Sequence, residues 1–384
     1  MLQSKKNVNE ILANPHNDDK VIAACSLFGC LDITGRNFSG EGVVQAIANM
    51  HNRGNGLGGG FGVYGLYPEH KDHYAFHIMY TSRDVKAETD VFLEEHFDII
   101  EDEEIPTKHH HPITNPPLLW RYFVLPRTEP QFHDNHVVEK VMTINKESKG
   151  AYVFSSGKNM GVFKGVGYPE DIARFFRLDD YKGYLWTAHG RFPTNTPGWW
   201  GGAHPFNLLD WTVVHNGEIS SYGINRRYLE TRGYPCTLQT DTEVMAYAVD
   251  LLMRRHRLPI ETACKVFAPP FWSQIDQMSQ EEQNLYRTIR QVYPSLLMNG
   301  PFTVIIARHG EMLGLTDRIR LRPLTAATRG NLLYLSSEEA AIRLISPDLD
   351  RVWTPNGGEP VIGKVGTQAR AQPAEGPYTE VRRK

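Results

Sequence analysis

The stretch FTVIIARHGEMLGLT (302–316) contains two runs of strand-forming residues, 302–308 and 311–316, which only His309 and Gly310 separate. So short a connection joins antiparallel strands, because parallel strands need a long crossover. The same hydrophobic patterns predict further elements on both sides of this hairpin. Strands are expected at 25–33, 61–67, 73–80, 183–189, 210–215 and 331–337, and helices at 41–52, 224–232, 240–254 and 338–345. The chain is therefore predicted to be an α+β protein in which helices cover antiparallel sheets in one layered domain.

The composition is that of an ordinary globular protein and gives no reason to expect nucleic acid or a membrane as a partner. The 384 residues include 41 Lys and Arg against 44 Asp and Glu, so the formal net charge is −3. Hydrophobic residues make up 41%, and no apolar run approaches the roughly 18 residues that a membrane helix needs. Four cysteines are too few for a disulfide framework, so a reducing, cytoplasmic location is expected.

Three segments differ in character from the rest. Residues 1–24 are a polar leader without the apolar core of a secretory signal. Residues 84–140 contain an acidic run and several prolines, and they are predicted to be an insertion with some helix and an irregular surface segment. Residues 366–384 are polar without periodicity and are predicted to be a flexible tail.

Two motifs that often indicate a cofactor or a metal have the wrong context here. Gly54, Gly56 and Gly59 fit the pattern GxGxxG, but a helix is expected before them and a strand after them, the reverse of a dinucleotide site. A turn that brings backbone close to another segment is the favoured interpretation. The three histidines at 109–111 cannot all face one ion from regular structure. A solvated loop is predicted there, and neither a cofactor nor a metal is expected in this chain.

A more specific combination is formed by short segments in a fixed order. They are ACSLFG (24–29), HNRG (51–54), HGRFPTNT (189–196), HNGEI (215–219) and TDTE (240–243), with DR (317–318), LRPL (321–324) and SSE (336–338) after them. This set resembles the class II glutamine amidotransferases, in which an N-terminal cysteine releases ammonia from glutamine. It is most similar to the glutaminase domain of glutamate synthase, in the form in which that domain is a separate polypeptide.

The resemblance extends from residue 25 to about residue 365, and it implies both a domain and a fold. The domain would be a class II glutamine amidotransferase domain over 25–365, preceded by a leader or propeptide. The fold would be an Ntn-hydrolase-like αββα sandwich, with two antiparallel sheets between helical layers. The sequence departs from the family pattern at Ser26, where many members have glycine, and in the insertion at 84–140.

Cys25 is the candidate nucleophile. A thiol within a chain has a pKa near 8.5 and needs a neighbouring base, whereas an α-amino group titrates near neutrality and could take the thiol proton. If cleavage after Ala24 makes Cys25 the first residue, that residue carries its own base. A buried structural cysteine in a strand is the alternative.

The resemblance gives the other site residues their roles. The Asn216 side-chain amide and the Gly217 N–H would donate to the oxyanion, although Asn-Gly after a strand is also a common turn. Arg191 would bind the α-carboxylate of glutamine and Asp241 its α-ammonium group; the alternatives are a surface ion pair and a helix-start residue. Thr194 and His215 are also predicted to bind substrate.

Three further interpretations concern neighbouring residues. Arg53 would lie beside the nucleophile and help to hold the active site, and an exposed arginine in a glycine-rich loop is the alternative. Thr240 and Glu243 match a capping box at the start of a helix. Trp199 and Trp200 are candidates for a lid over glutamine, for core residues or for partner contacts.

The predicted function is that of a glutaminase subunit of a glutamate-synthase-type complex. Glutamine would be hydrolysed through a Cys25 thioester, and ammonia would pass to a separate synthase subunit in a hetero-oligomer. The resemblance places flavin mononucleotide (FMN) and an iron–sulfur cluster on that partner. Three alternatives are an amidotransferase subunit for another acceptor, as in an N-methylglutamate synthase-like system, an inactive scaffold that retains its leader, and an N-terminal nucleophile hydrolase for another amide.

Overall fold

A computed structural model describes residues 24–193 and 198–367. The predicted leader up to residue 23 and the predicted tail from residue 368 lie outside this part of the chain. Within it, no helix combines the length and the apolar character needed to cross a membrane.

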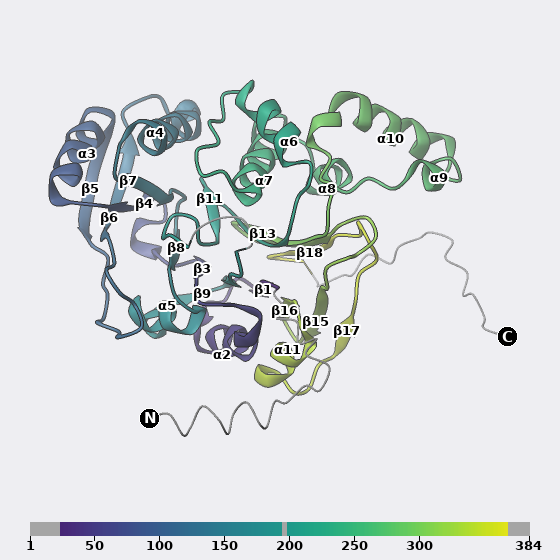
Figure 1. The fold of residues 1–384 in the computed structure, drawn as a ribbon, viewed down its shortest axis with the longest axis horizontal. Helices are drawn as coiled ribbons and strands as arrows, with labels where there is room; N and C mark the ends of the chain where they lie inside the picture. Colours follow the sequence, from purple (N-terminus) through teal and green to yellow (C-terminus); the bar gives the residue numbers. More distant parts are fainter. Residues whose placement is uncertain (1–23, 194–197, 368–384) are drawn as a thin grey trace, which may run out of the picture.

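Two antiparallel sheets form the centre of the molecule (Figure 1). The first has seven strands in the order β17-β15-β16-β1-β10-β3-β8. Their bounds are β17 (Arg351–Trp353), β15 (Thr325–Arg329), β16 (Leu332–Ser336), β1 (Ser26–Asp32), β10 (Leu185–Gly190), β3 (Gly59–Tyr64) and β8 (Met160–Gly165). The second has five strands in the order β11 (Phe206–Leu208), β12 (Trp211–Gly217), β13 (Phe302–Arg308), β14 (Glu311–Thr316) and β18 (Val361–Lys364).

The pleat of β1 explains how the two sheets pack. Residues two apart on a strand share a face, and Leu27, Gly29 and Leu31 are all buried. A Cβ atom at Gly29 would lie 2.8 Å from Met312 Sδ, on β14 of the other sheet. Side chains of alternate residues of β1 therefore point between the sheets, and Cys25 continues this alternation at the N-terminal end.

Helices cover the outer face of each sheet, as Figure 1 shows. On the seven-stranded sheet lie α2 (Glu41–Asn49), α5 (Pro169–Phe175) and α11 (Glu339–Ile345). On the other side lie α6 (Tyr222–Glu230), α7 (Asp241–Val249) and α8 (Ile260–Phe267), with α9 (Trp272–Ile275) and α10 (Gln280–Val292) beyond them. A π-helical turn, Asp250–Arg255, extends α7. The predicted αββα sandwich of an α+β protein is confirmed.

The region predicted to be an insertion is more regular than the sequence indicated. It contains the helices α3 (Arg83–His96) and α4 (His133–Glu147) and two strands that were not predicted, β5 (Phe97–Glu104) and β6 (Leu118–Pro126). These strands join β4 (Tyr74–Tyr80) and β7 (Ala151–Ser155) in a four-stranded sheet of order β5-β6-β4-β7. Strands β2 (Phe38–Ser39) and β9 (Lys182–Gly183) form a small separate pair.

Candidate active site

Cys25 and Arg191 are neighbours because β1 and β10 are paired antiparallel. Ser26, the first residue of β1, is opposite Gly190, the last residue of β10. Cys25, directly before β1, and Arg191, directly after β10, therefore lie at the same end of this strand pair.

The second sheet and α7 bring the remaining predicted residues to the same place. His215, Asn216 and Gly217 end β12, which pairs with β13. Asp241 is the first residue of α7, and its Oδ2 accepts a hydrogen bond from the Ile219 N–H at 2.9 Å. The loop after β12 is thereby tied to the start of the helix.

A cavity of about 380 Å³ opens between these segments. Five of the eight predicted site residues line it, namely Cys25, Arg191, His215, Gly217 and Asp241. Two more, Arg53 and Asn216, lie beside it. Thr194, the eighth, lies outside the described residues. The cavity lining consists of Cys25, Arg191, Phe192, Pro193, His204, His215, Gly217, Glu218, Ile219, Tyr222, Gln239, Thr240, Asp241 and Thr242.

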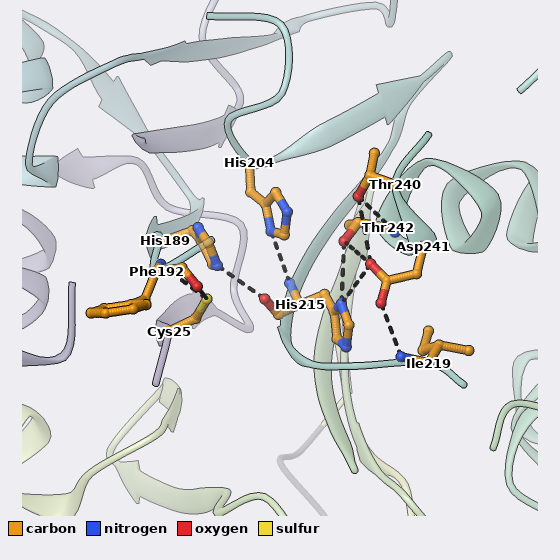
Figure 2. Close-up of polar contacts among 9 residues, drawn as sticks. All are labelled: Cys25, His189, Phe192, His204, His215, Ile219, Thr240, Asp241 and Thr242. Carbon is orange, nitrogen blue, oxygen red and sulfur yellow. Dashed lines mark hydrogen bonds and ion pairs between the residues drawn. The ribbon is translucent and has the colours of Figure 1, made fainter. Parts of the chain in front are cut away.

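The Cys25 thiol is held by the residue after Arg191. The Phe192 N–H donates a hydrogen bond to Sγ at 3.3 Å, and Sγ lies 3.8 Å from the Phe192 carbonyl oxygen (Figure 2). Burial raises the pKa of the Cys25 thiol, and the Phe192 N–H and the Arg191 charge only partly oppose this effect. The thiol consequently needs a base to become a nucleophile.

Arg53 contacts the backbone of Cys25, not its side chain. Its Nε donates to the Cys25 carbonyl oxygen at 3.2 Å, and its Nη1 lies 2.8 Å from Glu338 Oε1. The guanidinium thus connects the residue just before β1 to the residue just before α11. This geometry places Arg53 next to the backbone of the candidate nucleophile.

The end of β12 carries two candidate donors: Gly217, which lines the cavity, and Asn216, which directly precedes it. Asn216 is 1% exposed, and its Nδ2 has no hydrogen-bond partner among the described residues. Gly217 has φ of +138°, and a Cβ atom there would lie 1.9 Å from the Pro301 carbonyl oxygen. Glycine is therefore required at 217. A buried amide without a partner is costly unless a ligand accepts its hydrogen bond.

Asp241 is held in its charged form by several donors. Burial alone would raise the pKa of this carboxyl, but His215 and hydrogen bonds from Ile219 and Thr242 lower it. Oδ1 lies 3.4 Å from His215 Nδ1, and the Thr242 hydroxyl donates to it at 3.3 Å (Figure 2). An ionised aspartate beside the cavity can bind an ammonium group.

Two buried histidines support the wall of the cavity and were not predicted. His189 Nε2 lies 2.9 Å from the His215 carbonyl oxygen, and His204 Nδ1 accepts from the His215 N–H at 3.4 Å. The two rings are stacked with centroids 4.0 Å apart. Burial lowers the pKa of His189 to about 3 and that of His204 well below its usual range. Both imidazoles are therefore neutral near pH 7 and act as fixed hydrogen-bonding groups.

The capping box predicted at the start of α7 is not formed, although Thr240 still caps the helix. Thr240 is the N-cap, and its hydroxyl accepts from the Thr242 N–H at 3.3 Å. The Glu243 carboxylate does not return to Thr240; it accepts the N–H groups of Thr237 at 3.1 Å and Leu238 at 2.9 Å. The prediction of a reciprocal box was wrong, because the preceding loop folds back over the helix and supplies other donors.

The glycine-rich stretch after α2 packs against Arg191. The Arg191 N–H donates to the Gly58 carbonyl oxygen at 2.8 Å, and a Cβ atom at Gly58 would lie 2.9 Å from Arg191 Cδ. The interpretation of this stretch as a close backbone approach is confirmed.

The other two weak motifs also have clear positions. His110 Nε2 lies 2.7 Å from Asp171 Oδ1, within hydrogen-bond distance. No group of three or more His, Cys, Asp or Glu within residues 24–193 and 198–367 is placed to hold a metal ion. Trp199 and Trp200 do not line the cavity of Cys25 but line a neighbouring one, so a lid of these indoles directly over that cavity is not what the geometry shows.

Comparison with known proteins identifies a family. The family model described as "Glutamine amidotransferases class-II" matches residues 131–353. This range includes Arg191, Asn216, Gly217 and Asp241, and it begins after Cys25.

Three relatives show how far the similarity extends. An uncharacterized protein of Archaeoglobus fulgidus is 60% identical over 92% of this chain and 95% of its own length. The glutamine–fructose-6-phosphate aminotransferase of Vibrio cholerae is 28% identical over 43% of this chain and 24% of its own length. The glutamate synthase [NADPH] large chain of Bacillus subtilis is 28% identical over 50% of this chain and 14% of its own length. The chain thus spans only a minor part of both named enzymes.

Proposed function

Because the chain belongs to the class II glutamine amidotransferases, we propose that it is the glutaminase subunit of a glutamate-synthase-type complex, with Cys25 as its nucleophile. The observation that carries this proposal is the position of Cys25, Arg191 and Asp241 around one cavity. The cavity combines a thiol with a guanidinium and a carboxylate, which match the two charged groups of free glutamine.

The chemistry follows from the surroundings of the thiol. Cleavage after Ala24 would give Cys25 a free α-amine, which takes the Sγ proton while sulfur attacks the side-chain carbonyl carbon of glutamine. The carbonyl oxygen then accepts hydrogen bonds from Asn216 Nδ2 and the Gly217 N–H. The tetrahedral intermediate collapses and the C–N bond breaks. The α-ammonium group of Cys25 then returns its proton to the departing ammonia. Water attacks the thioester and releases glutamate and the thiol.

Burial of Cys25 explains why such a base is needed. Its thiol pKa is raised by burial, in spite of the nearby Arg191. The neutral histidines His189 and His204 are hydrogen-bonded to the backbone of His215, whereas Sγ is hydrogen-bonded to Phe192. An α-amine on the same residue satisfies the requirement without any other side chain.

The similarity between half of this chain and the large chain of a glutamate synthase supports the proposal of a synthase partner. In this proposal the partner subunit receives ammonia and carries FMN and the iron–sulfur cluster. An acceptor other than 2-oxoglutarate, as in an N-methylglutamate synthase-like system, would use the same glutaminase chemistry.

The intact mass of the purified chain provides the test. Loss of residues 1–24 together with release of ammonia from glutamine would support an active glutaminase. Active protein that retains its initiator methionine would contradict the mechanism, and an inactive chain with residues 1–24 attached would favour a scaffold. Co-purification with a flavoprotein would support the complex, whereas full glutamate synthesis by the chain alone would exclude a separate synthase subunit.

A further inference from the structure

A second cavity, of about 550 Å³, lies between the four-stranded sheet and two loops of the sandwich. Ligand-binding cavities commonly have volumes in this range. Its walls come from the ends of β4 and β7, from the loop before β6 and from two segments near the catalytic cavity. We refer to it as the tryptophan cavity, after Trp199 and Trp200.

None of the described residues that line the tryptophan cavity has a charged side chain. Its lining includes aromatic groups, among them Tyr80, Tyr152, Trp199 and Trp200, and the uncharged polar residues Thr81, Asn115, Ser148 and Thr237. The rings of Trp199 and Tyr152 have centroids 5.8 Å apart, and Trp199 remains 37% exposed. Such a surface offers flat apolar faces with a few hydrogen-bonding groups at the edges.

One wall is shared with the catalytic cavity. A Cβ atom at Gly202 would lie 2.6 Å from Trp199 Nε1 and 3.3 Å from Arg191 Nη1. Gly202 therefore separates the indole of one cavity from the guanidinium of the other. The Lys164 Nζ fixes this wall by donating to the Gly201 carbonyl oxygen at 3.0 Å.

A second wall is shared through one continuous loop. Thr237 and Leu238 line the tryptophan cavity, whereas residues 239–242 line the catalytic cavity. The N–H groups of Thr237 and Leu238 are both bound to Glu243, which lies two residues after Asp241. The two residues proposed to bind the charged groups of glutamine, Arg191 and Asp241, thus each lie next to a wall of the tryptophan cavity.

We propose that the tryptophan cavity is a second ligand site, which takes an uncharged planar heterocycle of the nucleoside class and alters the affinity for glutamine. A charged ring system would be desolvated there without a compensating partner, whereas an uncharged ring can stack on indole and phenol faces. Hydroxyl and amide groups of Thr81, Asn115 and Ser148 can bind the polar edge of such a ring. The effect on glutamine follows from the shared walls and is reciprocal.

Calorimetric titration of the full chain with adenosine tests the site without using glutamine. We expect saturable binding at one site, with a dissociation constant below about 1 mM. The Ser148→Trp substitution would fill the cavity and should weaken binding at least about tenfold. Lys149→Trp is the matched control, because the neighbouring Lys149 is exposed and does not belong to the lining. It adds the same bulk and should leave adenosine binding unchanged.

Any of three results would contradict the proposed ligand site. The first is that neither adenosine nor uridine binds saturably, and the second is that Ser148→Trp and Lys149→Trp weaken adenosine binding equally. The third is that AMP binds more tightly than adenosine. The coupling rests on the proposed glutaminase function and has its own test. Saturating adenosine should change the KM for glutamine at least about twofold in the wild type and not in Ser148→Trp. An unchanged KM would overturn the coupling. Adenosine binding by a chain without glutaminase activity would contradict the proposed function and leave the site in place.

Discussion

Arg53 and Glu338 form an ion pair, with Nη1 2.8 Å from Oε1, that joins the start of the central strand β1 to the residue before α11. The same guanidinium donates from Nε to the Cys25 carbonyl oxygen. The pair therefore fixes the backbone of the residue whose sulfur and amine are proposed to react together.

Loss of this pair should affect turnover. Glu338→Ala is expected to lower kcat about three- to tenfold with little change in KM, a modest effect because both side chains are partly exposed. Glu338→Gln keeps an oxygen acceptor for Arg53 and should recover part of the activity. Glu339→Ala removes only the ion pair with Arg343 at 2.6 Å on the surface of α11 and serves as the control. A pure KM effect of Glu338→Ala would contradict the positioning role.

The Cys25 sulfur should be indispensable. Cys25→Ser is expected to abolish glutaminase activity, since a hydroxyl is far less acidic than a thiol and is harder for an amine to activate. Cys30→Ser is a matched control for the loss of a thiol, because Cys30 is buried in β1 and lies outside the cavity. Ordinary ammonia release by Cys25→Ser would disprove the proposed nucleophile.

Asn216 should act on the transition state. Asn216→Ala is expected to lower kcat by about two to three orders of magnitude, the usual effect of removing one oxyanion donor. Steady-state kinetics on glutamine measure this directly. A change confined to KM would instead indicate that the amide binds ground-state glutamine.

Arg191 should determine the affinity for free glutamine. Arg191→Lys keeps the charge but loses the planar pair of donors, so we expect KM to rise about tenfold or more. A glutamine derivative whose α-carboxylate is amidated should show a much smaller difference between wild type and variant. An equal difference for both substrates would mean that Arg191 does not bind the carboxylate.

Glu243 should make stability depend on pH. Burial raises the pKa of its carboxyl to about 7, although Leu238 and Thr237 donate to the carboxylate. The folded chain therefore holds this proton over a range in which the unfolded chain has lost it. The contribution of Glu243 to the free energy of unfolding is fully present below about pH 4. It is lost as the pH rises to about 7, which lowers the free energy of unfolding by at most about 3 kcal/mol. Glu243→Gln, which cannot ionise, should lack this decrease in denaturant titrations between pH 5 and 8.

Local signals predicted much of the sandwich. The strands at 302–308 and 311–316 have the predicted bounds and pair antiparallel, because a two-residue turn determines both register and direction. The edge strand β5 was missed because its second half, EDEE at 101–104, is acidic and largely exposed. The segment that connects β5 to its partner β6 contains prolines at 112, 116 and 117, and these prolines indicated irregular structure.

The site was predictable as a set of residues but not as a network. The resemblance indicated Cys25, Arg191 and Asp241, and these three line one cavity. The pairing of Arg53 with Glu338 spans 285 residues of sequence, and no local pattern predicts it. The contacts of His189 and His204 with the backbone of His215 likewise depend on how the sheets face each other.

The place of Cys25 directly before a central strand has a practical consequence for anyone who produces the protein. Because β1 pairs with β10 on one side and with β16 on the other, the sheet sets the position of Cys25 at the end of the strand. In the proposed mechanism, a handle fused directly onto Cys25 would turn the α-amine that acts as the base into an amide. Recombinant material intended for kinetics should carry any handle at the opposite terminus.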